Sequence, residues 1–360
     1  MLREVWVQNC ICRRDTDKGI GEACEVMSVK IGYWAPQERY EPYQLLENTV
    51  LAEKHGFETV VTSDHFHPWF HTKASSGFAW VWMAAVAERT RKMEIGTGVT
   101  APTMRYHPAI VAQAFATLGS MYPGRIILGV GTGEAMNEMP LGFGWPKFKE
   151  RLDRLKEAIE VIRALWSGEF VSYEGTFYRL RNAKIYALQK KPIPIFVGAG
   201  GPKSAELAGR LADGLLTVVL SPEYYRQTIV PAFEKGARLA GKDPDEMEKM
   251  VELKLSFDED YEKAEESCRC WMANEVPNVI SLPISDPREL EKLGKKEGDI
   301  RAWHITTNPE DHIKVIEDHI KLGFNRIQLN SSSPDEKKFI TRYGKEVLPY
   351  LKEKYGTNRR

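Results

Sequence analysis

Apolar and polar positions alternate between two periods along the chain from residue 27 onward. Short, nearly continuous apolar runs are typical of buried strands, and the longer segments between them repeat apolar residues every three or four positions, as amphipathic helices do. The expected strands are residues 29–33, 59–62, 94–98, 126–130, 194–197, 214–218, 251–257 and 326–329. The expected helices are residues 43–55, 109–121, 148–166, 203–211, 224–240, 260–273, 311–322 and 336–353.

This alternation predicts an α/β fold, a (β/α)8 TIM barrel formed by a single domain over residues 27–360. Near-continuous apolar strands favour a parallel barrel, and no glycine-rich dinucleotide fingerprint opens the first unit of an open sheet. Two insertions are expected. Residues 167–181 carry Glu174-Gly175 between alternating apolar residues, which indicates a β-hairpin. Residues 274–302 form a long, proline-containing segment of the kind that often serves as a lid.

Residues 1–26 lack hydrophobic periodicity, so they are interpreted as an arm of unknown role, with Met27 as an alternative start of the protein. This region contains Cys10, Cys12 and Cys24, whereas Cys268 and Cys270 lie far downstream. The spacing matches no common zinc site, so we expect reduced thiols and no metal, with a site shared by the first three cysteines as the weaker alternative.

Composition narrows the classes of partner. Hydrophobic residues make up 42% and charged residues 28% of the 360 residues, and the formal net charge is zero, as in an ordinary globular protein. Basic and acidic residues are interleaved, which argues against nucleic acid as a partner. No apolar run reaches the length of a membrane span and no signal peptide is evident, so we expect a cytoplasmic protein without a membrane partner.

The first candidate site follows an expected strand at the segment Ser63–Trp69, which reads SDHFHPW. In a βα-repeat protein the residues just past the carboxyl ends of strands line the active site. Asp64, His65, His67 and Trp69 crowd an acid, two imidazoles and an indole into that position. A capping aspartate with a packed aromatic turn is the structural alternative, but the cluster favours a functional site.

The second candidate is the segment GVGTGEAMNE at residues 129–138. Its alternating glycines are expected to let a bulky ligand approach the backbone. It is not a phosphate loop, because it lacks the lysine and the glycine spacing of those motifs. Glu134 is expected to face the same pocket as His65, and a carboxyl with an imidazole is suited to moving two protons. A helix-capping glutamate is the alternative.

Two further strand ends are rich in small residues. In the segment GAGGPK at residues 198–203, glycines precede an expected helix, and the N–H groups of a helix N-terminus bind phosphate well. Such a turn also occurs simply to make a corner. In the segment GTGVTAP at residues 96–102, small residues suggest a flat ring packed against the backbone, with a bulge behind the ring.

Together, the segments SDHFHPW, GTGVTAPTMRYHPA, GVGTGEAMNE and GAGGP resemble the luciferase-like barrel superfamily. Within it they are most similar to dehydrogenases that use the 8-hydroxy-5-deazaflavin coenzyme F-420. The resemblance runs from about residue 28 to near the C-terminus and covers members that act on sugar 6-phosphates and members that act on secondary alcohols. It implies a small-molecule substrate and a homodimer, with FMN as the alternative cofactor.

The resemblance also implies roles. His65 is the base that takes the proton of the substrate hydroxyl while hydride leaves for the coenzyme, Trp69 holds the same oxygen, and Glu134 assists protonation of the reduced ring. A deazaflavin carries hydride, so the protein supplies proton transfer and positioning. The bulge behind the ring is expected at Gly98–Val99, where a non-proline cis peptide is one way to form it. The residues expected at the coenzyme are Asp64, Gly98, Val99, Thr100, Asn137, Gly198, Ala199, Gly200 and Gly201.

Substrate choice is where the sequence departs from the family pattern. In the sugar-phosphate members two lysines and an arginine hold the substrate phosphate, but here Leu220 and Ser281 align with the lysines and Arg301 alone keeps its charge. Because each charge-assisted bond to phosphate is worth about 1.5–3 kcal/mol, we expect an uncharged alcohol as the substrate. Glu38 and Trp69 complete the expected substrate-binding residues.

Four alternatives remain open. The nearest is oxidation of glucose 6-phosphate or another sugar 6-phosphate by the same coenzyme. A methylene-tetrahydromethanopterin reductase would use the coenzyme without an alcohol base, and a flavin-dependent monooxygenase would use the same barrel. The last alternative is a flavin-binding protein without turnover, against which the joint presence of His65 and Glu134 argues.

Overall fold

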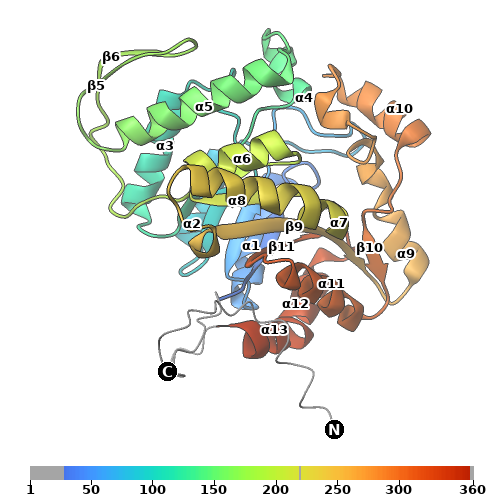
Figure 1. The fold of residues 1–360 in the computed structure, drawn as a ribbon. Helices are drawn as coiled ribbons and strands as arrows, with labels where there is room; N and C mark the ends of the chain where they lie inside the picture. Colours follow the sequence, from blue (N-terminus) through green and yellow to red (C-terminus); the bar gives the residue numbers. More distant parts are fainter. Residues whose placement is uncertain (1–27, 219, 357–360) are drawn as a thin grey trace, which may run out of the picture.

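The computed structural model describes residues 28–218 and 220–356. Eight parallel strands close into a barrel surrounded by helices, which confirms the predicted (β/α)8 fold (Figure 1). Every strand expected from the hydrophobic pattern is present, with its ends shifted by at most a few residues. The barrel strands are β1 (Lys30–Ala35), β2 (Thr59–Thr62), β3 (Glu94–Thr97), β4 (Ile126–Val130), β7 (Ile195–Gly198), β8 (Gly214–Thr217), β9 (Glu248–Phe257) and β11 (Arg326–Ser331).

Strand β9 is the longest and has three neighbours. Its first residues pair with β8, its middle pairs with β11, and its last three residues pair with the short strand β10 (His304–Thr306) outside the barrel. Strand β10 was not expected. Its three residues are too few to show a periodic pattern, and it is stabilised by pairing with the last three residues of β9.

The helices follow the expected order, with the short α4 (Ala135–Glu138) and the insertion helix α10 (Pro287–Glu297) added. A third unexpected helix is α2 (Ala79–Arg89). Its sequence AWVWMAAVAER is apolar at nearly every position, so no amphipathic stripe marks it. The other long helices are α1 (Pro42–Lys54), α3 (Pro108–Met121), α5 (Phe148–Leu165), α6 (Pro202–Leu211), α8 (Val230–Leu239), α11 (Pro309–Lys321), α12 (Glu336–Glu346) and α13 (Leu348–Tyr355).

The two expected insertions contain local structure of their own. Strands β5 (Val171–Glu174) and β6 (Arg179–Ala183) form an antiparallel hairpin that extends at one edge of the molecule (Figure 1). The second insertion contains the turn η5 (Val279–Ser281) and the helix α10 (Pro287–Glu297). It packs with Trp69, Phe70 and the short helix η4 (Arg269–Ala273) in a separate apolar cluster. The second insertion therefore covers the loop that follows β2.

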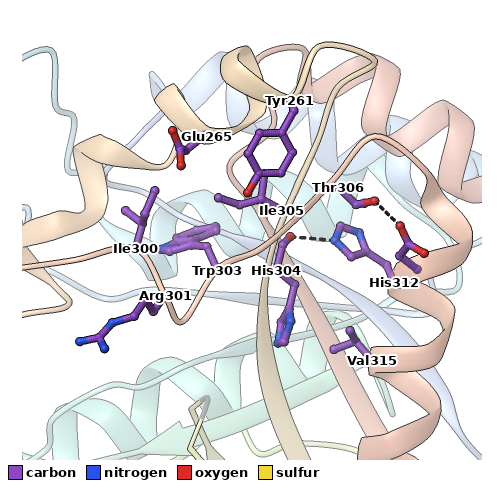
Figure 2. Close-up of a pocket in the computed structure, with 11 residues that line it drawn as sticks. Tyr261, Glu265, Ile300, Arg301, Trp303, His304, Ile305, Thr306, His312 and Val315 are labelled. Atoms are coloured by element: carbon purple, nitrogen blue, oxygen red, sulfur yellow. Dashed lines mark hydrogen bonds between the residues drawn. The ribbon is translucent and has the colours of Figure 1, made fainter.

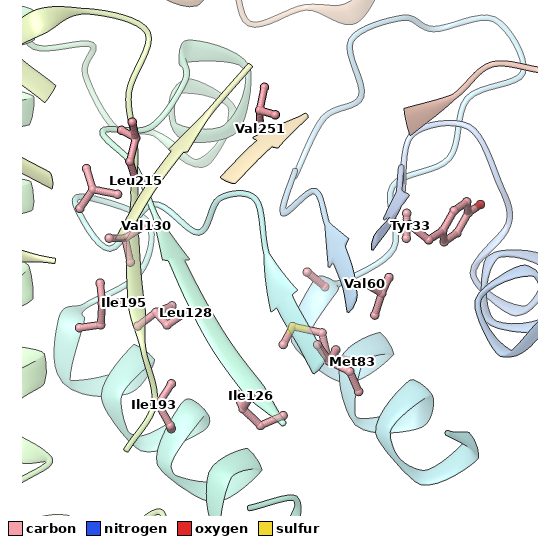
Figure 3. Packing of buried hydrophobic residues seen from close by; sticks show 14 of the residues in the cluster. Tyr33, Val60, Met83, Ile126, Leu128, Val130, Ile193, Ile195, Leu215 and Val251 are labelled. Atoms are coloured by element: carbon pink, nitrogen blue, oxygen red, sulfur yellow. The ribbon is translucent and has the colours of Figure 1, made fainter. Parts of the chain in front are cut away.

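Alternation along the strands divides the core into two layers. Trp34, Val61, Phe196, Leu216 and Met250 point into the barrel and fill its interior. The neighbouring strand positions, such as Val60, Ile126 and Leu128, point outward and pack against helix residues such as Met83 (Figure 3). The outward cluster is much larger than the interior one, as is usual for a barrel of eight strands whose centre is filled by side chains.

Two features are absent from the described residues. None of their helices is long and apolar enough to cross a membrane. No group of three or more histidines, cysteines, aspartates or glutamates in the described ranges could hold a metal ion. The predicted arm at residues 1–26, with Cys10, Cys12 and Cys24, lies outside the described residues.

Candidate active site

Three loops that follow barrel strands bring an imidazole between two carboxyl groups. Glu38 comes after β1, His65 after β2 and Glu134 after β4. The Nδ1 atom of His65 lies 3.3 Å from a Glu38 oxygen, and its Nε2 atom lies 3.3 Å from a Glu134 oxygen. Because the carboxyl ends of parallel strands meet at one end of a barrel, residues distant in sequence converge here. The structure thus places Glu134 beside His65, where the sequence analysis expected it.

Burial dominates the electrostatics of this group. It lowers the pKa of His65, although the nearby charge of Glu134 opposes that shift. It raises the pKa of Glu38 and of Glu134, because a charged carboxylate is poorly solvated there. A neutral imidazole has one N–H and one lone pair, so it can donate to one carboxylate and accept from a second, protonated group. The arrangement is therefore suited to accepting and passing on a proton.

Each carboxyl group is held by a neighbour. Ser63 donates a hydrogen bond of 2.6 Å from Oγ to Glu38, which is 3% exposed. Asn137 donates from Nδ2 to Glu134 at 3.0 Å and accepts a 2.7 Å bond from the backbone N–H of Phe66. Asn137 was expected at the coenzyme. Here its amide ties Glu134 to the loop that carries His65, so it fixes the position of both groups.

The carboxylate of Asp64 belongs to a polar cluster that the sequence analysis did not identify. It accepts hydrogen bonds from Thr100 at 2.7 Å, from Arg105 at 3.1 Å and from Tyr106 at 3.1 Å. Burial raises the pKa of the neighbouring Glu138 to about 7, although Arg105 lies beside it. Arg105 and Tyr106 follow the third expected strand, which could have marked them as residues of this end of the barrel. The sequence does not show that they contact Asp64, so it assigned them no role.

Trp69 lies against the imidazole. The His65 and Trp69 ring centroids are 5.8 Å apart with the planes tilted by 60°. The indole is buried in the apolar cluster of the second insertion. Its N–H makes no hydrogen bond to any described residue, so it remains available to an oxygen atom bound near His65, as the sequence analysis expected.

Two glycines of the segment GVGTGE lie where a side chain would clash with neighbouring atoms. A Cβ on Gly129 would lie 1.9 Å from the Thr97 carbonyl oxygen, and one on Gly131 would lie 2.5 Å from a methyl group of Val99. Gly129 and Gly131 thus make room for the neighbouring strand end, a reason that the sequence analysis did not give. The Gly98–Val99 peptide bond is cis, as anticipated. Thr100, expected at the coenzyme, is fully buried and bonded to Asp64 and Trp80.

In the loop that leads into α6, two glycines have free space where a side chain would lie. A Cβ on Gly198 would lie 3.2 Å from Val99, but one on Gly200 or Gly201 would meet no atom within 4 Å. Ala199 is buried, and its N–H donates to Leu216. Within the described chain, the N–H groups of Gly200 and Gly201 form no backbone hydrogen bond. An anion such as a phosphate can therefore approach these groups at the positive end of the helix.

The three residues aligned with a phosphate clamp do not form one. Leu220 is half-buried against the outer core, and Ser281 is exposed in the turn η5. The side chain of Arg301 is 89% exposed and bonds twice to Asp299, at 2.8 and 2.6 Å. Figure 2 shows its guanidinium extending away from the Trp303 ring at the edge of a surface hollow. The structure therefore does not place Arg301 in the buried group around His65.

Comparison with known proteins adds a family and relatives. The family model of luciferase-like monooxygenases matches residues 28–322. An F-420-dependent glucose-6-phosphate dehydrogenase of Nakamurella multipartita is 42% identical over 91% of this chain and 98% of its own length. The enzyme of the same name from Microbacterium testaceum is 40% identical over 91% of this chain and 99% of its own length.

Two solved structures resemble this chain, at different levels of sequence identity. An F-420-dependent secondary alcohol dehydrogenase, solved with an F-420–acetone adduct, is 41% identical and has a TM-score of 0.86 over 90% of this chain and 99% of that one. The F-420-dependent tetrahydromethanopterin reductase of Methanopyrus kandleri is 24% identical, with a TM-score of 0.72 over 90% and 99% of the two chains. At that identity the second likeness concerns the fold alone.

Proposed function

The chain belongs to the luciferase-like monooxygenase family, and we propose that it is an F-420-dependent oxidoreductase that takes hydride from the carbinol carbon of a small uncharged alcohol. A secondary alcohol is the preferred substrate. The observation that carries the proposal is the imidazole of His65, held between two carboxyl groups and against the Trp69 indole at the carboxyl end of the barrel.

The described residues fit a deazaflavin coenzyme. The open faces and unbonded N–H groups of Gly200 and Gly201 suit its phosphate. Val99, which fills the space beside Gly131 and Gly198, supplies an apolar wall for a flat ring. When bound, F-420 supplies a two-electron hydride acceptor. Relatives that are about 40% identical over their full length are named for the same coenzyme.

The chain itself supplies the proton chemistry. Burial lowers the pKa of His65, which favours the neutral imidazole, and a neutral ring nitrogen can accept the proton of the substrate hydroxyl. Trp69 orients the same oxygen through its indole N–H. Glu38 and Glu134 stabilise the imidazolium that forms, since each carboxyl oxygen is 3.3 Å from a ring nitrogen. Asn137 and Ser63 keep the two carboxyl groups in place.

The preference for an uncharged alcohol is supported by the missing phosphate clamp. Leu220 and Ser281 carry no charge, and the guanidinium of Arg301 is exposed and already paired with Asp299. A phosphate group in this site would lack the several charge-assisted bonds that hold it elsewhere. The alcohol dehydrogenase at 41% identity agrees with this preference.

Oxidation of glucose 6-phosphate is the second candidate. It is favoured by the names of the curated relatives at 39–42% identity. Absorbance of oxidised F-420 distinguishes the two when the purified protein is given isopropanol or glucose 6-phosphate in parallel. We expect reduction with isopropanol and none above background with the sugar phosphate. The reverse result would replace the alcohol proposal, and reduction by neither would refute both.

A homodimer is the proposed assembly. Tyr43 on α1, Val81 on α2 and Ile110 on α3 are large apolar side chains that are 69%, 71% and 54% exposed. Exposed apolar groups of this size are often covered by a partner. Light scattering of the purified protein tests the proposal, because a monomeric mass at micromolar concentration would contradict it.

A further inference from the structure

A lysine on the inner wall of the barrel lies at the same end as His65. Met250 of β9 belongs to the interior cluster, and side chains two and four residues further along a strand share its face. Glu252 and Lys254 therefore also point inward, nearer the carboxyl end. Both are buried, at 6% and 8% exposure. The sequence analysis assigned neither a role.

The strand order connects Lys254 with the site. Around the barrel, β9 neighbours β11, β11 neighbours β1, and β1 neighbours β2. Asn330 of β11 is in register with Lys254 and donates a 2.6 Å bond to Glu252. Glu38 follows β1, and its charge contributes to the raised pKa of Glu252, after burial and against the opposing charge of Lys254. These inward-facing groups thus form an arc that runs from Lys254 to Glu38, next to His65.

The charge of Lys254 is neutralised by the second insertion. Its Nζ atom donates to Glu275 at 2.5 Å and to Asn274 at 2.7 Å. The Lys254 and Glu275 side chains are 10% and 11% exposed, so water screens the pair weakly. An ammonium group committed to a buried carboxylate is not available to a second anion. A phosphate group near it would also meet the negative charge of Glu275.

We propose that Glu275 is a specificity-determining residue: by pairing with Lys254 on the inner wall, it makes the site reject substrates that carry a phosphate group. This inference rests on the proposed function, because it concerns the substrate of the same site. It explains why a buried cation at the same end of the barrel as His65 does not replace the missing clamp. Removing the carboxylate charge while keeping the side-chain shape should free Lys254 to bind phosphate.

The test is Glu275→Gln, with glucose 6-phosphate and inorganic phosphate as probes. Calorimetric titration of the protein saturated with F-420 measures phosphate binding without turnover. We expect both probes to bind about ten- to a hundredfold more tightly to the variant than to the natural protein, the range of one charge-assisted bond. Adding Lys254→Met to the same protein should remove the gain. Glu275→Ser offers a second variant if the glutamine protein does not fold.

Glu289→Gln is the matched control, since it removes one exposed glutamate charge from the same insertion. It should leave the dissociation constants of both probes unchanged. Equal phosphate binding by Glu275→Gln and the natural protein would overturn the inference, as would a gain that survives Lys254→Met. Isopropanol turnover is measured alongside. If turnover is absent but the gain in phosphate binding occurs, the proposed alcohol activity fails and the role of Glu275 stands.

Discussion

Charged side chains cluster at both ends of the barrel, and the two clusters differ in how their acids are paired. At the carboxyl end, Glu38 and Glu134 flank His65, and burial raises the pKa of both acids. At the amino end, Arg326 bonds Glu94 at 2.5 Å and Glu248 at 2.8 Å. Glu38 and Glu134 have no lysine or arginine bonded to them, whereas Arg326 bonds both acids at the amino end.

The amino-end cluster consists of the first residues of four strands. Lys30, Glu94, Glu248 and Arg326 open β1, β3, β9 and β11, and Lys30 adds a 2.6 Å bond to Glu94. Burial raises the pKa of Glu94, but Arg326 and Lys30 outweigh it, so the net shift is downward. The two clusters differ in whether their acids are bonded to an arginine or a lysine. Balanced charges stabilise the closed barrel, and unbalanced ones are kept where protons move.

The largest effect is expected from His65→Ala, which removes the base from the unbalanced end. Turnover of isopropanol with F-420 should fall by about 10²–10⁴-fold, the usual contribution of a general base. The free energy of unfolding is measured alongside, because the imidazole packs against Trp69 and its removal leaves a cavity. His71→Ala on the same loop is the control, since His71 is exposed. Near-normal turnover with unchanged coenzyme binding would show that His65 is not the base.

Arg326→Met should break the balanced end. Glu94 and Glu248 would lose their shared cation, and we expect a loss of about 2–4 kcal/mol in the free energy of unfolding. The loss stays below that of a fully unpaired charge because Lys30 remains beside Glu94. Urea denaturation measures it. Arg179→Met, which breaks the exposed pair with Glu174, should cost at most about 1 kcal/mol. Equal losses in both variants would remove the distinction between the two clusters.

Opposite pH dependences sharpen the comparison further. Glu94 has a lowered pKa, so its charge stabilises the fold above the ordinary glutamate range, and this stabilisation is lost as the pH falls. Glu38 has a raised pKa, so its charge costs stability above that range. At pH 7 Glu94→Gln should therefore be less stable than the natural protein, and Glu38→Gln more stable.

The Glu94 difference should shrink as the pH falls below about 4.5, the ordinary glutamate pKa, because its folded pKa lies lower. The Glu38 difference should already shrink as the pH falls toward about 4.5 from above, because its folded pKa lies higher. Urea denaturation from pH 4 to pH 8 measures them. Differences of the same sign for the two variants at pH 7 would contradict the assignment of one end as balanced and the other as unbalanced. We expect each to be smaller than the effect of Arg326→Met, because a neutral glutamine keeps part of the hydrogen bonding.

The sequence predicted the barrel because its strands are uniformly apolar, and it predicted His65 and Glu134 because each directly follows such a strand. It did not predict the amino-end cluster. Glu94 and Arg326 are single charges at strand starts, and nothing local shows that they meet. It also did not predict that Gly129 lies too close to the Thr97 carbonyl oxygen to carry a side chain. Local patterns indicate which residues lie at a strand end, whereas contacts between strands depend on the register of the closed barrel.

The smallest effect is expected from Arg301→Ala, which breaks an ion pair that belongs to neither end. Its guanidinium is 89% exposed and bonded to Asp299, so unfolding should change by less than about 1 kcal/mol. The KM for isopropanol should change by less than about twofold. Titration with glucose 6-phosphate is the sharper measurement. A marked loss of sugar-phosphate affinity in the variant would mean that Arg301 turns inward when substrate binds, and that a cation at the carboxyl end is supplied from the surface. An unchanged, weak affinity would mean that this end holds its acids without any cation for the substrate, which is the condition that an uncharged alcohol requires.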